Sequence, residues 1–252
     1  MYFESHAHYD DEAYNEDRDE LLLSLKNCGV DYVVQNAANI SSSKEGIELA
    51  KKYDFIYCTI GVHPHDVEEL DEDQFKELKR LSREHKVVAI GEIGLDYYYD
   101  NAPRNLQKYW FEKQMEWSKE VNLPIVVHSR EASQDTFDLI EKVNPIGGVI
   151  HCYSGSVEMA KEYVKKGFYI GVGGTVTFKN AKKVIEVVNE IPLSSILIET
   201  DAPYLSPVPL RGKRNDSRNL KYIVEKIAKI KGITPEEVAR ITMENGKKLF
   251  KI

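Results

Sequence analysis

Cysteine and long apolar runs are scarce in this sequence. The three cysteines, Cys28, Cys58 and Cys152, are an odd number and lack CxxC spacing, which argues against a disulfide framework and against a structural zinc knuckle. The longest apolar runs are far shorter than the ~20 residues that a membrane helix needs. No basic region and no apolar core of signal-peptide length follow Met1. We therefore expect a cytoplasmic protein that does not bind membranes.

Positive charge is also low, since 34 Lys and Arg residues face 41 Asp and Glu residues and the formal net charge is -7. Proteins that hold nucleic acid through surface charge alone are usually basic. Any attraction for nucleic acid must therefore be confined to a local site. The chain also lacks Gly/Ser linkers, charge blocks and low-complexity segments, so we predict a single domain over residues 1–252.

Short apolar, β-branched runs alternate with amphipathic stretches of helical spacing along the whole chain. This alternation predicts an α/β protein, a (β/α)8 TIM-type barrel with an additional C-terminal helix from Thr234 to about Phe250. An open, doubly wound sheet is the main alternative. The predicted strands cover residues 2–4, 32–35, 55–61, 87–91, 124–128, 148–151, 168–171 and 196–199.

Histidines and acidic residues gather in or just after these predicted strands. Neutral imidazoles and carboxylates are the ligands of zinc or mixed divalent sites. In the His6-Ala7-His8 segment the two rings are two positions apart on an extended chain, so both can reach one ion. Ligand candidates spread over many strands favour a closed ring of strands over an open sheet. The candidate ligands are His6, His8, Glu92, His128, His151 and Asp201.

Two carboxylates are candidates for catalysis. Glu92 can bridge two divalent ions through its two oxygens, although a strand-terminal glutamate can also cap a helix or pair with a lysine. Asp201 can bind one ion and accept the proton of its bound water. Glu199, two residues earlier, can support the ligands or form an ion pair in the core, and we expect the supporting role.

The remaining polar residues near the predicted strand ends are candidates for substrate contact. We expect His63 to contact substrate or transition state and His65 to be structural, because other residues already complete a ligand set. Arg130 and the loop that starts at Arg211 can bind phosphate, unless that loop is simply solvated. Residues Tyr97–Tyr99 can stack on nucleobases or pack on the following helix.

The ordered motifs of the chain closely resemble those of the TatD family of metal-dependent deoxyribonucleases. The resemblance extends over essentially the whole sequence. Its segments are Ser5-His6-Ala7-His8-Tyr9-Asp10, Gly61-Val62-His63-Pro64-His65, Gly91-Glu92-Ile93-Gly94-Leu95-Asp96-Tyr97, Leu123-Pro124-Ile125-Val126-Val127-His128-Ser129-Arg130, His151-Cys152-Tyr153-Ser154-Gly155 and Glu199-Thr200-Asp201-Ala202-Pro203-Tyr204.

The resemblance implies hydrolysis of DNA phosphodiester bonds with two divalent cations, whether Mg²⁺, Mn²⁺ or Zn²⁺. It implies that the first ion is held by His6, His8 and Asp201, the second by His128 and His151, and both by Glu92. The chain departs from the family pattern at two places. Glu4 stands where the family usually has Asp, and Asp216-Ser217 without a proline follows the Arg211 loop.

The sequence therefore predicts a two-metal deoxyribonuclease with a role in DNA repair or degradation, and it indicates no obligate protein partner. Asp201, Glu92 and His63 are the expected catalytic residues, and His63, Arg130 and Arg211 the expected substrate contacts. The first alternative is a small-molecule amidohydrolase or phosphotriesterase-like hydrolase on the same barrel. The second is a metal-dependent binding protein without turnover.

Overall fold

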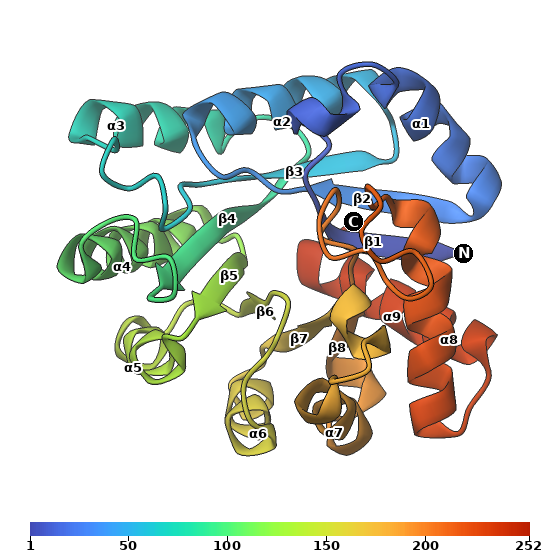
Figure 1. Cartoon of the computed structure of the whole chain (residues 1–252). Helices are drawn as coiled ribbons and strands as arrows, with labels where there is room; N and C mark the ends of the chain where they lie inside the picture. Colours follow the sequence, from blue (N-terminus) through green and yellow to red (C-terminus); the bar gives the residue numbers. More distant parts are fainter. The chain divides into compact units, whose positions relative to one another are not determined.

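Eight strands form the sheet of this computed structural model, which describes all residues from 1 to 252 (Figure 1). Their order across the sheet is their order in the chain. All eight predicted strands are confirmed, with boundaries that differ by a few residues. The strands are β1 (Tyr2–Ala7), β2 (Val30–Gln35), β3 (Ile56–Ile60), β4 (Val87–Asp96), β5 (Ile125–Arg130), β6 (Gly148–Ile150), β7 (Tyr169–Val172) and β8 (Ile196–Ile198).

A helix follows every strand, and a further helix ends the chain, as predicted. The last helix begins after Thr234, whose side chain accepts a hydrogen bond from the amide of Glu237 and so caps the first turn. None of the helices combines the length and apolar composition needed to cross a bilayer. The helices are α1 (Arg18–Leu25), α2 (Ile40–Lys52), α3 (Glu72–Leu81), α4 (Arg104–Val121), α5 (Ser133–Val143), α6 (Val157–Lys165), α7 (Lys182–Glu190), α8 (Leu220–Lys231) and α9 (Pro235–Phe250).

The chain divides into two compact units, and the prediction of one domain over residues 1–252 stays a prediction. The first unit combines residues 1–35 with 152–252, and the second comprises residues 36–151. In the first unit β1 pairs with β2, β7 pairs with β8, and Ala7 and Ala202 form a parallel bridge. In the second unit β3, β4, β5 and β6 pair in that order, all parallel.

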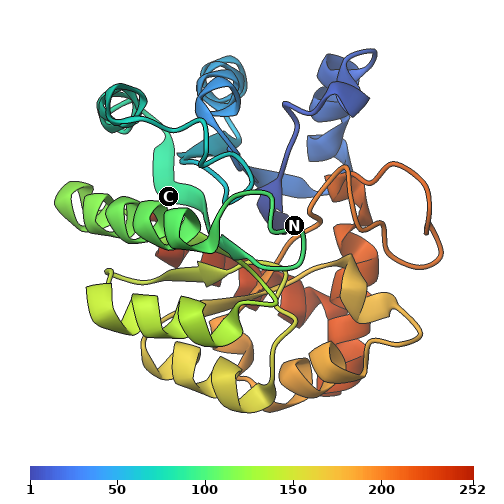
Figure 2. The ribbon, with the colours of Figure 1, turned by 60° about the vertical axis from the view of Figure 1, so that its left-hand side comes forward.

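Helix α9 closes the core of the first unit. It lies beside α8 (Figure 2) and against β1. The rings of Phe3 on β1 and Phe250 on α9 stack with centroids 5.8 Å apart. Gly246 faces the Phe3 ring so closely that a Cβ at this position would lie 2.6 Å from it. Asn245 donates hydrogen bonds to the carbonyls of Leu193, just before β8, and of Ile196, the first residue of β8. The C-terminal helix is therefore an integral part of this core.

Strand β4 is longer than predicted, which places Glu92 inside the strand instead of at its end. The sequence prediction ended at residue 91, where the continuous apolar run ends. Here Gly94 pairs with His128 of β5 at a φ of 149°, where a Cβ would lie 1.9 Å from the His128 carbonyl oxygen. Gly94 thus allows the close approach of the two strands and extends β4 as far as Asp96.

Candidate metal centre and substrate contacts

Three predicted ligands converge in the first unit. The Nε2 atoms of His6 and His8 lie 3.1 Å apart, and the Asp201 Oδ1 atom lies 3.8 Å from the first and 3.5 Å from the second. We call His6, His8 and Asp201 the first half-site. Two nitrogens bound tetrahedrally at the usual zinc–nitrogen distance would lie about 3.3 Å apart. The donor atoms and their spacing therefore fit a divalent cation.

Backbone pairing between two distant segments places these three side chains. The amide of Asp201 donates to the His6 carbonyl at 3.0 Å, and the amide of His8 donates to the Ala202 carbonyl at 2.7 Å. Asp201 has a φ of 56°, in the left-handed region that side chains other than glycine rarely adopt. Such a conformation is retained where the surroundings enforce it, and these sites are often functional.

Glu4 supports the first half-site from within the core. It is fully buried and accepts hydrogen bonds from the amide of His6, and from both the amide and the hydroxyl of Thr200. Burial raises the pKa of the Glu4 carboxyl to about 8, although these hydrogen bonds oppose the rise. Glu4 thus connects the segments that carry His6 and Asp201.

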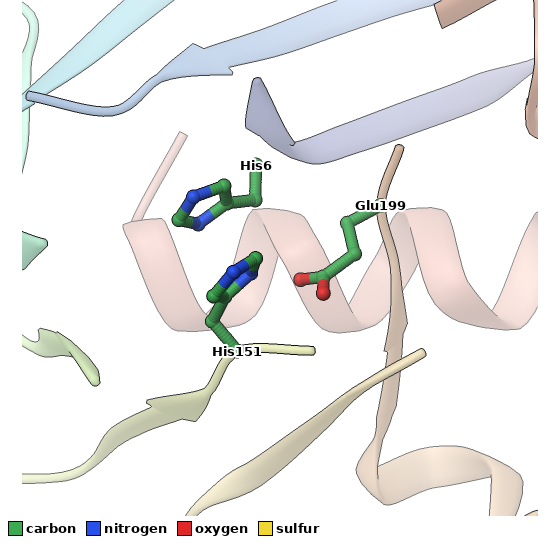
Figure 3. A group of neighbouring side chains, drawn as sticks. All are labelled: His6, His151 and Glu199. Atoms are coloured by element: carbon green, nitrogen blue, oxygen red, sulfur yellow. The ribbon is translucent and has the colours of Figure 1, made fainter. Parts of the chain in front are cut away.

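Glu199 follows β8 directly and is also fully buried. Its Oε1 accepts a hydrogen bond of 2.6 Å from the amide of Cys152. Figure 3 shows the Glu199 side chain on the segment after β8 and the His6 side chain on β1, and ligand atoms of the two side chains lie within 4.8 Å of each other. Glu199 therefore lies close enough to His6 to support the first half-site, and its supporting role stays a prediction.

The remaining predicted ligands surround Glu92 in the second unit. The Glu92 Oε1 atom lies 2.9 Å from His128 Nδ1, 3.7 Å from His63 Nε2 and 3.8 Å from His151 Nε2. We call Glu92, His63, His128 and His151 the second half-site. Its imidazole and carboxylate atoms suit a divalent cation. His63, which the sequence assigned to substrate, is therefore also in a position to be a ligand.

Asp96 is a site residue to which the sequence analysis gave no role. Its Oδ2 lies 2.9 Å from His65 Nε2 and 3.0 Å from His128 Nε2, so one carboxylate orients both rings. Burial raises its pKa, but the hydrogen bonds with His128, the Tyr99 amide and His65 outweigh burial and hold the pKa well below its usual range. In turn, burial disfavours the charged His128 ring, while Asp96 and Glu92 raise its pKa overall.

Two buried glutamines of α4 fix the backbone near the second half-site. Gln114 accepts from the amide of Val62 and donates to its carbonyl, next to His63. Gln107 makes the same pair of hydrogen bonds with the backbone of Asp96. The loops after β3 and β4 are therefore held by side chains of a helix, which limits the movement of the residues they carry.

Both predicted phosphate contacts carry an unneutralised guanidinium. Arg130, the last residue of β5, lies over the rings of Tyr98 and Tyr99, and Arg211 lies 3.9 Å from the Phe178 ring centroid. Neither arginine has an ion pair or a hydrogen bond to a protein acceptor. These donors remain available for an anion, which is the requirement for a phosphate contact.

Asn215 orders the loop that follows β8. The Asn215 side chain donates to the carbonyls of Thr200 and Tyr204, and its amide donates to the Pro203 carbonyl. The loop borders an open cavity of about 560 Å³, which Arg211 helps to line. These hydrogen bonds define the conformation of the loop, although the proline usual in the family does not follow it.

Tyr97 differs from the two tyrosines that follow it. Its hydroxyl donates to Asp135 at 2.6 Å, and its ring lies under Arg104, which pairs with Asp100. Tyr98 and Tyr99 instead expose 59% and 55% of their surface. The packing role considered for this run thus fits Tyr97 and not its neighbours.

The ring of parallel strands and the histidine–carboxylate clusters are those of a metal-dependent hydrolase of the (β/α)8 class. The family model described as TatD related DNase matches residues 3–251. The chain therefore belongs to the TatD family, and the predicted family and fold class are confirmed.

Relatives in sequence and structure agree with this assignment. YabD of Bacillus subtilis, described as an uncharacterized metal-dependent hydrolase, is 46% identical over 254 residues and covers 100% of both chains. The crystal structure of YJJV, a TatD homologue from Escherichia coli, matches with a TM-score of 0.94 and 28% identity, over 100% of this chain and 98% of that one. An organophosphorus hydrolase variant from Deinococcus radiodurans matches at a TM-score of 0.69 with 15% identity, over 99% of this chain and 92% of that one, which shows a shared fold alone.

Proposed function

We propose that this hydrolase is a deoxyribonuclease that cleaves phosphodiester bonds of DNA with two divalent cations. The observation that carries the proposal is the convergence of the His6, His8 and Asp201 donor atoms within 3.1 to 3.8 Å of one another. The family description as TatD related DNase supports DNA as the substrate. A role in DNA repair or degradation, in the cytoplasm, is part of the proposal.

The ligand assignment follows the family resemblance. In this proposal His6, His8 and Asp201 would hold one ion, His128 and His151 would hold the other, and Glu92 would be a ligand of both. Two such ions would supply a nucleophilic water at neutral pH and positive charge for the phosphoryl oxygens. Imidazole suits Zn²⁺ and carboxylate suits Mg²⁺ and Mn²⁺, so the proposal includes all three ions.

The residues of the chain itself provide proton transfer and substrate binding. Asp201 accepts the proton of the attacking water, and its exposed fraction of 15% leaves it accessible. His63, Arg130 and Arg211 bind phosphate oxygens, and the two arginines retain all of their guanidinium donors for this purpose. This local positive charge makes the net charge of -7 compatible with a DNA substrate.

The test compares metal-free wild type with Glu92→Ala and Asp201→Ala on labelled single- and double-stranded DNA. Each divalent ion is added in turn, and circular dichroism verifies that the variants are folded. We expect ion-dependent cleavage by wild type and loss of activity in both variants. Full nuclease activity in both variants would refute the mechanism.

The same preparations test the small-molecule alternative with amide, carboxylic ester and phosphotriester substrates. Many barrel hydrolases of that kind bridge their metals with a carboxylated lysine on the fourth strand. Strand β4 here, Val87–Asp96, contains no lysine and presents Glu92 instead. We therefore expect no ion-dependent turnover of these substrates, and efficient turnover of one of them without DNA cleavage would replace our proposal.

A further inference from the structure

Tyr98, Tyr99 and Arg130 form an exposed aromatic and cationic surface in the second unit. The two rings meet edge to face, with centroids 5.0 Å apart. The Arg130 Cζ atom lies 4.0 Å from the centroid of Tyr98 and 4.7 Å from that of Tyr99. Both rings remain more than half exposed. The surface thus offers accessible π-faces and a fixed positive charge within a few ångströms of each other.

The charge on this surface is not neutralised, whereas two other stacked pairs of the same unit have a carboxylate partner. Arg104 lies over Tyr97 but pairs with Asp100, as described above. Lys113 lies over Tyr109 and has Glu72 at 3.7 Å. Arg130 has no carboxylate and no other protein acceptor. All donors of this stacked guanidinium therefore remain available for an anionic ligand.

Asp96 holds this surface at a fixed position beside the second half-site. Its Oδ1 accepts from the amides of Tyr98 and Tyr99, while its Oδ2 faces His128 and His65. The His65 ring also meets Tyr99 edge to face at 5.3 Å. The backbone of both tyrosines is therefore bound by the same carboxylate that faces the ring of His128.

We propose that Tyr98, Tyr99 and Arg130 form a nucleobase-binding subsite. One base stacks on an exposed tyrosine ring, and Arg130 donates to a phosphate of the same strand. Stacking platforms combined with basic groups are a recurring way to bind unpaired nucleotides. The proposal deepens the proposed function and rests on it for the identity of the polymer. A protein partner is the alternative occupant, and in that case binding of an oligonucleotide would not depend on its bases.

The experiment measures binding without cleavage, by fluorescence anisotropy in EDTA and again with Ca²⁺. The probes are a short fluorescein-labelled oligodeoxythymidylate and an abasic oligomer of the same length. The variants are Tyr98→Ala/Tyr99→Ala, Arg130→Gln, and Tyr109→Ala as an exposed tyrosine of the same unit outside the subsite. The double variant should remain folded, because both side chains are exposed and Asp96 contacts only their backbone amides.

We expect wild type to bind thymidylate more tightly than the abasic oligomer. Loss of both rings should weaken thymidylate binding by about 5- to 100-fold, because stacking of one base contributes roughly that much. Binding of the abasic oligomer should not change, and Tyr109→Ala should behave as wild type. Arg130→Gln should weaken binding of both probes. Equal binding of the two probes, or no binding by wild type in either buffer, overturns the subsite.

The subsite and the proposed function can fail separately. Base-dependent binding by a protein that cleaves no DNA would retain the subsite and refute the nuclease. Ion-dependent cleavage of DNA by a protein that binds both probes equally would retain the nuclease and refute the subsite.

Discussion

Replacement of Asp96 by Asn provides a sharp test of how the second half-site works. The Asp96 carboxylate is fully buried and faces four hydrogen-bonding groups: the amides of Tyr98 and Tyr99 at 3.0 and 2.9 Å, and the rings of His65 and His128 at 2.9 and 3.0 Å. A carboxylate has about four acceptor positions, so all are used. The amide of Asn retains only one accepting oxygen.

The side-chain amide of the introduced Asn can adopt two orientations, and one of them costs much less free energy than the other. If its nitrogen faced the backbone amides, two buried N–H groups would lose their acceptor, at about 1–3 kcal/mol each. If its nitrogen instead faces the rings, His128 Nε2 can accept its hydrogen bond. The proton of a neutral His128 must then lie on Nδ1, which is the atom 2.9 Å from Glu92 Oε1. The fold survives, but a cation must displace that proton.

We therefore expect Asp96→Asn to weaken divalent-ion binding while leaving most of the stability intact. Carboxylate partners of metal-binding histidines typically change affinity by about 10- to 100-fold. Isothermal titration calorimetry of the metal-free protein measures the affinity, and urea unfolding measures the stability. Asp135→Asn is the matched control, because Asp135 pairs with Lys108 and Tyr97 at the surface of the same unit. Unchanged ion affinity in Asp96→Asn would contradict the reasoning.

Three further predictions concern other parts of the chain. Glu4→Leu would leave the amide and hydroxyl of Thr200 without an acceptor. We expect the free energy of unfolding to fall by about 1–3 kcal/mol for each of these donors. Urea unfolding that matches wild type would contradict this role. Burial raises the pKa of the Cys58 thiol from 9.0 to about 12. Iodoacetamide at pH 8 should therefore label exposed Cys28 in the folded protein but Cys58 only after denaturation. Mass spectrometry of the labelled protein measures both outcomes. Arg211→Ala should reduce the slope of the logarithm of the DNA-binding constant against the logarithm of salt concentration by about one, the value for one phosphate contact. An unaltered slope would show that Arg211 does not contact the DNA.

The elements of the fold could be predicted because their signals are local. Buried parallel strands are continuous apolar runs, and amphipathic helices have a distinct period, so the alternation is visible in the sequence. The exception was the end of β4, where Gly94 continues the strand because β5 approaches it closely. That approach depends on His128, 34 residues later in the chain, and cannot be derived from the glycine alone.

The candidate ligands could be selected from the sequence, whereas the roles of Asp96 and Glu4 could not. His6, His8 and Asp201 follow apolar runs, and the structure brings them together. The role of Asp96 depends on which rings and amides face its two oxygens, a property of the folded chain. A signal existed, since Asp96 directly follows Leu95 at the end of an apolar run. The contact of Glu4 with Thr200 joins residues that are 196 positions apart, and no local pattern indicates it.

The distribution of charge explains how an acidic protein can be suited to DNA. Most arginines of the chain are neutralised, as Arg214 is by Asp17 and Arg218 by Asp216. Arg130 and Arg211 are instead held against aromatic rings. An aromatic face restrains a guanidinium without using its hydrogen-bond donors, and a carboxylate would both restrain and neutralise it. Stacking therefore preserves two local positive charges in a chain of net charge -7, and these charges need no basic surface around them to attract phosphate.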